Sequence, residues 1–188
     1  MPGGELQSVS RGQKRIEFAA LTAFRPCAKM KGVDIMRERK RPMMNIRIKK
    51  LRPNAKLPVY STEGAAGADL CVCLDEPVTI RPGETVMLPL GLAIEIPEGY
   101  VGLTHARSGL ASKRGIAPAN KVGVIDSDFR GEMMAALHNH GQEPQTIEPG
   151  ERVLQLLIMP VVQAVFEEAD ELSETGRGAG GWGSTGRR

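Results

Sequence analysis

The sequence predicts an all-β domain of the jelly-roll or barrel kind. From Ile46 onward, β-like runs recur at close spacing, and most of them are only a few residues long. Turn signals rich in glycine and proline separate nearly all of these runs. Long amphipathic helical stretches do not lie between them, as they would in a parallel α/β sheet. Many short strands joined by turns are typical of jelly rolls and barrels.

The expected strands follow from apolar runs bounded by turns such as Arg81-Pro-Gly83, Pro97-Glu-Gly99 and Glu148-Pro-Gly150. Only Ser108–Lys113 is expected to form a helical turn, with Ser108 as its N-cap. The N-terminus of such a helix exposes backbone N–H groups that bind anions. We expect strands at residues 46–48, 69–74, 78–80, 84–88, 92–96, 100–105, 122–125, 132–138, 145–147 and 153–166.

Length and composition favour one cytoplasmic domain. With 188 residues and 41% hydrophobic content, the chain can bury one sizeable core. The sequence has no run of 18 apolar residues and no signal peptide pattern, so we expect no membrane span and no secretion. Three cysteines, Cys27, Cys71 and Cys73, form an odd set. They are expected to be reduced core thiols.

The charge is distributed unevenly along the chain and suggests three segments. Residues 1–42 hold ten Lys/Arg and four Asp/Glu, a net charge of +6, which leaves −3 for residues 43–188 out of the total of +3. We expect 1–42 to be a basic, disordered extension, with translation starting at Met43 or Met44 as one alternative and nucleic-acid contact as another. Residues 43–172 would form the β domain, which is not expected to bind nucleic acid. Residues 173–188 would form a flexible glycine-rich arm.

Five segments pair glycine with functional side chains, and together they suggest one phosphate site. The last of them matches the spacing of a dinucleotide fingerprint, but no helix follows it, so the Rossmann interpretation fails. Cations at Arg107, Arg152 and Arg177 lie in an otherwise acidic body, as a polyanion site would require. The segments are Ala65-Ala-Gly-Ala-Asp-Leu70, Arg107-Ser-Gly-Leu-Ala111, Val122-Gly-Val-Ile-Asp-Ser-Asp-Phe-Arg-Gly-Glu132, Gly150-Glu-Arg-Val-Leu-Gln155 and Arg177-Gly-Ala-Gly-Gly-Trp-Gly-Ser-Thr-Gly186.

Asp126 is the candidate base of this site. It stands at a polar corner between two apolar runs, where a carboxylate is held at a tight turn. Nearby Asp128 and Arg130 are interpreted as a solvated turn pair. His138 and His140 share a strand face, but further ligands at metal spacing are missing, so surface positions are expected for them.

The five segments, in this order over residues 65–186, resemble the five motifs of the trimeric dUTPases. That resemblance implies a jelly-roll-like (β-clip) subunit in a homotrimer. Each active site would be shared between subunits and closed by the C-terminal arm. The implied reaction is Mg²⁺-dependent hydrolysis of dUTP to dUMP and diphosphate, which lowers dUTP and supplies dUMP for thymidylate synthesis.

The resemblance also implies roles for individual residues. Asp126 would orient and deprotonate the attacking water, and Asp69 would help to hold Mg²⁺ through water. Phe129 would pack on the deoxyribose and leave no room for a 2′-hydroxyl. Uracil would be read by Asn120 and by the backbone of a hairpin containing Val124, Ile125 and Met134. The phosphates would meet Arg107, Ser108, Gly109 and Gln155, and the closing arm would add Arg177, Trp182, Gly183, Ser184 and Thr185.

Two departures and two alternatives remain open at this point. Phe129 stands where the family usually has Tyr, and Trp182 where Phe is common, which bears on sugar discrimination and stacking. A dCTP deaminase-like enzyme of the same fold is the nearest alternative, but Asp126 and the glycine-rich tail favour the pyrophosphatase. A non-catalytic dUTP-binding regulator is the other alternative, and the presence of Asp69 and Asp126 argues against it.

Overall fold

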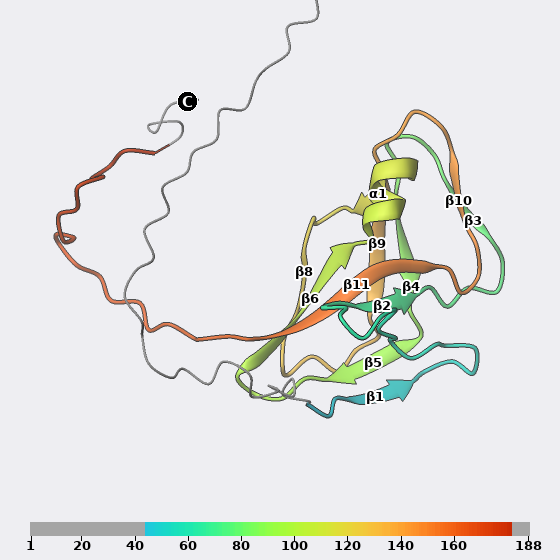
Figure 1. Ribbon diagram of the computed structural model, residues 1–188, viewed down its shortest axis with the longest axis horizontal. Helices are drawn as coiled ribbons and strands as arrows, with labels where there is room; N and C mark the ends of the chain where they lie inside the picture. The colour runs from blue at the N-terminus through green and yellow to red at the C-terminus, as the bar shows by residue number, and fades with distance from the viewer. Residues whose placement is uncertain (1–43, 182–188) are drawn as a thin grey trace, which may run out of the picture. The chain divides into compact units, whose positions relative to one another are not determined.

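A computed structural model describes residues 44–181 (Figure 1). The chain divides into two units, Met1–Pro42 and Met43–Arg188, and all described residues belong to the second. The basic extension at 1–42 and the end of the arm at 182–188 lie outside the described residues. In the described part, no helix is both long and apolar enough to cross a membrane.

The described residues form an all-β fold with one short helix, as the sequence predicts. Every strand pairing among them is antiparallel. The strands join into sheets β1-β5, β10-β3, β2-β11-β6-β8 and β4-β9-β7. Their bounds are β1 Arg47–Lys50, β2 Ala68–Cys71, β3 Val78–Ile80, β4 Thr85–Pro89, β5 Leu92–Glu95, β6 Tyr100–Ala106, β7 Ile116–Pro118, β8 Gly123–Ile125, β9 Met134–Asn139, β10 Gln145–Ile147 and β11 Arg152–Pro160.

Two strand predictions were wrong. The sequence pattern does not predict β7, because three residues ending in proline carry almost no periodicity. This strand is defined by its pairing with β9. The strand expected over 153–166 ends at Pro160, where pairing with β6 stops. Beyond it, Val162 and Phe166 are 91% and 95% exposed. Apolar sequence alone does not make a strand there, because beyond Pro160 the described chain continues the ladder only with the bond from Val161 N–H to the Gly99 carbonyl, at 2.9 Å.

The helix α1 (Ser108–Arg114) is close to the expected one but is capped differently. Its N-cap is Arg107, in an extended conformation, and Ser108 is the first helical residue. No described side chain caps the N-terminus by a hydrogen bond. Leu110 is buried against the core, and Gly115 ends the helix with a φ of 68°, a left-handed conformation that glycine adopts without strain.

The core lies between the sheets and is almost wholly aliphatic. Alternation along β9 points one face inward, whereas three consecutive residues are buried in each of β2 and β5. Removing these side chains from water supplies the main driving force of folding, at roughly 25 cal/mol per Å². The largest fully buried side chains are Leu70, Val72, Ile80, Leu90, Leu92, Ile94, Ile96, Ile116, Leu137, Asn139, Ile147 and Val153.

Asn139 is the polar member of this fully buried set. Its Nδ2 donates to the carbonyls of Ile80 and Glu143, both at 2.9 Å, and its Oδ1 accepts from the N–H of Gly141 at 2.8 Å. These bonds tie the end of β9 to β3 and to the turn before β10. A buried polar side chain is tolerated at this position because its donor and acceptor groups are satisfied.

We expect Asn139→Ala to lower the free energy of unfolding by about 3 kcal/mol, because it leaves buried backbone groups without partners. Urea unfolding followed by circular dichroism measures this. Asn45→Ala, at an exposed position, is the matched control and should cost well under about 1 kcal/mol. Equal losses in the two variants would show that the Asn139 bonds do not stabilise the fold.

Candidate active site in two hollows

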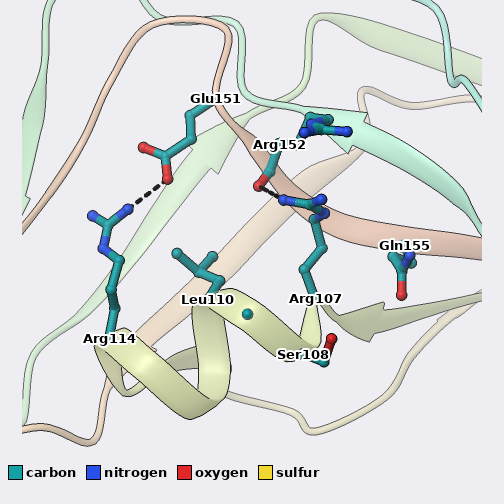
Figure 2. A pocket seen from close by; sticks show the side chains of 8 residues that line it. Arg107, Ser108, Leu110, Arg114, Glu151, Arg152 and Gln155 are labelled. Carbon is teal, nitrogen blue, oxygen red and sulfur yellow. Dashed lines mark hydrogen bonds and ion pairs between the residues drawn. The ribbon is translucent and has the colours of Figure 1, made fainter. Parts of the chain in front are cut away.

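The first hollow, here called the Arg107 hollow, is cationic and has a volume of about 230 Å³. Arg107 and Arg114 extend from the two ends of α1 toward β11 (Figure 2). Its lining brings together all four residues that the sequence analysis assigned to phosphate binding before the arm. They are Arg107, Ser108, Gly109 and Gln155, joined by Leu110, Arg114, Glu151 and Arg152.

A buried carboxylate lies behind these cations. Asp69 in β2 is only 3% exposed. Its Oδ1 accepts from Arg107 Nε at 3.0 Å and Gln155 Nε2 at 3.3 Å, and its Oδ2 accepts from Ser61 Oγ at 2.7 Å and Arg152 Nη1 at 2.9 Å. Four donors therefore converge on one side chain, which fixes both arginines relative to β2.

The environment keeps Asp69 ionised. Burial by itself would raise the pKa of this carboxyl group, but the hydrogen bond from Ser61 and the charge and hydrogen bond of Arg107 outweigh it. The net result is a pKa below the ordinary value of 3.8. Asp69 is therefore a fixed negative charge that orients the cations of the hollow.

Arg114 and Glu151 also line this hollow, although the sequence patterns did not predict a role for either residue. Arg114 Nη1 donates to Glu151 Oε1 at 2.6 Å, and Arg114 Nε donates to Gln145 Oε1 at 3.0 Å. Arg114 also donates to the carbonyl of Thr146. These bonds join the end of α1 to β10 and to the turn before β11. The only signal in the sequence was that Glu151 lies within a glycine-bearing segment and that Arg114 follows one closely.

The second hollow, here called the Asp126 hollow, is more apolar and has a volume of about 310 Å³. The sequence analysis expected a hairpin here, but β8 pairs with β6 whereas β9 pairs with β4 and β7. The segment between β8 and β9 therefore crosses from one sheet to the other. The hollow is lined by Met87, Leu90, Thr104, Pro118, Asn120, Gly123, Val124, Ile125, Asp126, Phe129, Glu132, Met133, Met134, Ala136 and Leu154.

Asp126 and Phe129 lie on the segment that follows β8. The Asp126 side chain is exposed, and among the described residues it makes no hydrogen bond or ion pair, so its carboxylate is free to bind a ligand or water. The Phe129 ring folds back over Gly131, where a Cβ atom would stand 2.8 Å from Phe129 Cζ. Gly131 is therefore needed for this ring position. Arg130 donates hydrogen bonds to the carbonyls of Ser127 and Phe129, and these bonds stabilise the turn that follows Asp126.

The two hollows of one chain lie on opposite faces of the same sheet. In β11, Gln155 lines the Arg107 hollow and the adjacent Leu154 lines the Asp126 hollow. Successive residues of a strand point to opposite faces. The register agrees, because Gln155 is paired with Asp69, whereas Leu156, on the face of Leu154, is paired with Thr104. A ligand in one hollow therefore does not extend directly into the other hollow of the same chain.

The arm residues are only partly described. Arg177 lies in an exposed turn and donates from Nε to the carbonyl of Gly180 at 2.6 Å. It does not line either hollow. Trp182, Gly183, Ser184 and Thr185, which the sequence analysis placed in the arm, lie outside the described residues.

The protein side chains alone do not form a metal site in the described residues, which contain no group of three or more His, Cys, Asp or Glu that could hold an ion. His138 and His140 have ring centroids 4.3 Å apart, and His138 Nδ1 is 2.8 Å from Thr85 Oγ1. Both oxygens of Asp69 already have donors. Mg²⁺ usually combines one or two carboxylates with substrate phosphates, so a bound polyphosphate would have to supply part of its ligands here.

Comparison with known proteins identifies a family. A family model described as dUTPase matches residues 53–186. The deoxyuridine 5′-triphosphate nucleotidohydrolase of Desulfitobacterium hafniense is 56% identical over 132 residues, covering 70% of this chain and 87% of the relative. The enzyme of the same name from Burkholderia cenocepacia is 50% identical over 145 residues, covering 77% of this chain and 98% of the relative.

Solved structures agree with this result. The dUTPase of Staphylococcus bacteriophage 80alpha with bound dUpNHpp superimposes with a TM-score of 0.67 at 27% identity, covering 77% of this chain and 99% of the phage protein. A point mutant of that phage enzyme, also with dUpNHpp, gives the same TM-score, identity and coverage. Because the family model spans all five glycine-bearing segments and the fold is shared, the chain belongs to the dUTPase family.

Proposed function

We propose that this chain hydrolyses dUTP to dUMP and diphosphate. The observation that carries the proposal is the combination of a free carboxylate, Asp126, at an apolar hollow of nucleobase size with a separate hollow lined by cations. An apolar cleft with a few polar groups suits a base and sugar, and clustered arginines suit phosphates. A cytoplasmic location belongs to the same proposal, because the substrate is a free nucleotide.

In this proposal the Asp126 hollow takes the deoxyuridine. Asn120 and the backbone of Val124, Ile125 and Met134 offer donors and acceptors to the uracil edge, and a mismatched base would leave them unpaired. Phe129 lies against the sugar and leaves no room for a 2′-hydroxyl. Phenylalanine keeps the stacking face of an aromatic ring without a phenolic hydrogen bond.

The triphosphate extends from the sugar to the Arg107 hollow of a neighbouring subunit. Arg107, the first turn of α1 at Ser108 and Gly109, and Gln155 hold the phosphates. Asp126 orients a water molecule and accepts its proton as the oxygen attacks the α-phosphorus in line. The bond from the α-phosphorus to the bridging oxygen breaks, and diphosphate leaves. Mg²⁺ bound to the phosphates would neutralise part of their charge.

A homotrimer with shared sites is part of this proposal, as the family resemblance implies, and the placement of the two hollows on opposite faces of one sheet supports sharing between copies. One dUTP molecule needs both hollows, so each must come from a different copy of the chain. The arm from residue 173, with Arg177 and the segment Trp182–Thr185, closes over the bound phosphates in this proposal. A mobile arm is suited to excluding water during the reaction.

Asp69 supports this site in two ways. Its carboxylate orients Arg107 and Arg152 by direct hydrogen bonds. It would also help to hold Mg²⁺ through water when dUTP is bound. A carboxylate that is hydrogen-bonded to two arginines fixes the orientation of their guanidinium groups at the Arg107 hollow. This lowers the entropy lost when phosphates bind.

The reaction is tested by diphosphate release from dUTP with Mg²⁺, measured beside dCTP, dTTP and UTP. Release from dUTP alone is expected, and comparable turnover of UTP would contradict the role of Phe129. Ammonia release from dCTP would support the deaminase alternative. Tight dUTP binding without turnover would support the regulator.

Asp126→Asn should reduce kcat for dUTP by about 10²- to 10⁴-fold and leave binding of dUpNHpp nearly unchanged, because it removes the base but keeps the shape. Stopped-flow diphosphate release and calorimetric titration measure the two quantities. Asp128→Asn, at the same corner, is the matched control and should keep most activity. Unchanged kcat in Asp126→Asn would show that Asp126 is not the base.

Asp69→Asn should lower the free energy of unfolding by about 3 kcal/mol at pH 7, because the arginines lose a buried partner. The lowered pKa of Asp69 makes this stabilisation complete above the unfolded value near 3.8 and removes it as pH falls toward the folded value. The gap between wild type and variant should therefore narrow below about pH 4 in urea titrations. Asp75→Asn, at an exposed position, is the control, and a gap independent of pH would contradict the ion-pair account.

Shared sites are tested by complementation. Asp126→Asn and Arg107→Gln chains should each be nearly inactive, because each lacks one half of the site. Co-expressed, they should form mixed trimers with some sites intact, so the mixture should regain a substantial fraction of wild-type activity. If each chain carried a complete site, the mixture would stay as inactive as its components.

A further inference from the structure

Thr104 carries a hydroxyl group that the proposed reaction has not used. The residue lies in β6 and is 9% exposed, and it lines the Asp126 hollow. Its hydroxyl has no hydrogen-bond partner among the described residues. No buried side-chain nitrogen or oxygen of the described residues lacks a partner, so solvent reaches this hydroxyl from the hollow, and a ligand group that enters can replace that water.

Backbone pairing does not use this hydroxyl. Thr104 is paired with Leu156 of β11 on one side and with Gly123 of β8 on the other. These neighbours occupy the strand's main-chain groups and leave its side chain on the inner face. That face belongs to the Asp126 hollow, as the position of Leu154 also shows.

The hydroxyl converges with a second polar group. Thr104 Oγ1 stands 2.2 Å from the place where a Cβ atom on Gly123 would be, and Asn120 Nδ2 stands 3.4 Å from the same place. Any larger residue at position 123 would collide with the hydroxyl. Gly123 therefore leaves space beside the Thr104 hydroxyl and the Asn120 amide. The other walls of the hollow include Leu90, Ile125, Met133 and Leu154.

We infer that Thr104 is a base-contacting residue, whose hydroxyl and the amide of Asn120 together bind one carbonyl oxygen of the uracil ring. This inference rests on the proposed function, because it takes the Asp126 hollow as the base site. Both groups can donate, and a uracil carbonyl oxygen has two lone pairs to accept them. In the unliganded chain water reaches the hydroxyl, so the contact with uracil affects binding more than folding.

The test uses Thr104→Val, which keeps the shape and removes the hydroxyl, and Thr104→Ser, which restores it. Calorimetric titration with dUpNHpp should show about tenfold weaker binding for the valine variant and near wild-type binding for the serine variant. KM for dUTP should rise in parallel, and kcat should stay close to wild type. The stability of the unliganded valine variant should be equal to or higher than that of wild type.

Thr79→Val is the matched control, because Thr79 lies in β3 and pairs with the Thr146 hydroxyl outside both hollows. It should leave the affinity for dUpNHpp unchanged. Wild-type affinity in Thr104→Val would overturn the inference while leaving the proposed function intact. A loss of unliganded stability in Thr104→Val would also overturn it, because the hydroxyl would then be structural. Failure of the wild-type protein to bind dUpNHpp or to hydrolyse dUTP would overturn the proposed function and this inference together.

Discussion

The arrangement of the cationic hollow depends on the buried carboxylate of Asp69. Its two oxygens accept hydrogen bonds from Ser61, Arg107, Arg152 and Gln155. Removing a charge from water is unfavourable unless it is paired and hydrogen-bonded, so these donors and the carboxylate hold one another in place. One interaction therefore joins β2, the start of α1 and β11, and it fixes the cations that would meet phosphates.

The pleat of a β-strand imposes the second constraint. Gln155 and Leu154 are neighbours in sequence, yet they line hollows on opposite sides of the sheet. A single chain therefore cannot offer its own base hollow and its own phosphate hollow to one nucleotide. Assembly is part of the proposed chemistry for this reason. The segment from Val161 to residue 179 is exposed throughout.

Sequence patterns predicted residues that line the two hollows, but they did not predict how the strands connect. The glycine-bearing segments pointed to Arg107, Asp126 and Gln155, and these residues line the two hollows. The patterns did not reveal β7, because its three residues become a strand only by pairing with β9. They also did not reveal that Arg114 reaches Glu151, since 37 residues separate them. Contacts at that separation depend on the topology of the sheets.

The sequence by itself determined the all-β class, the family resemblance and the candidate site residues, because periodicity, turn residues and local motifs depend on residues that are close together along the chain. Only the tertiary structure decided that Asp69 is saturated by four donors and that β8 and β9 belong to different sheets. It also decided that the Thr104 hydroxyl lies beside Asn120 over Gly123. These features depend on strand register and on which faces meet, and both are set by the cooperative packing of distant segments rather than by local sequence.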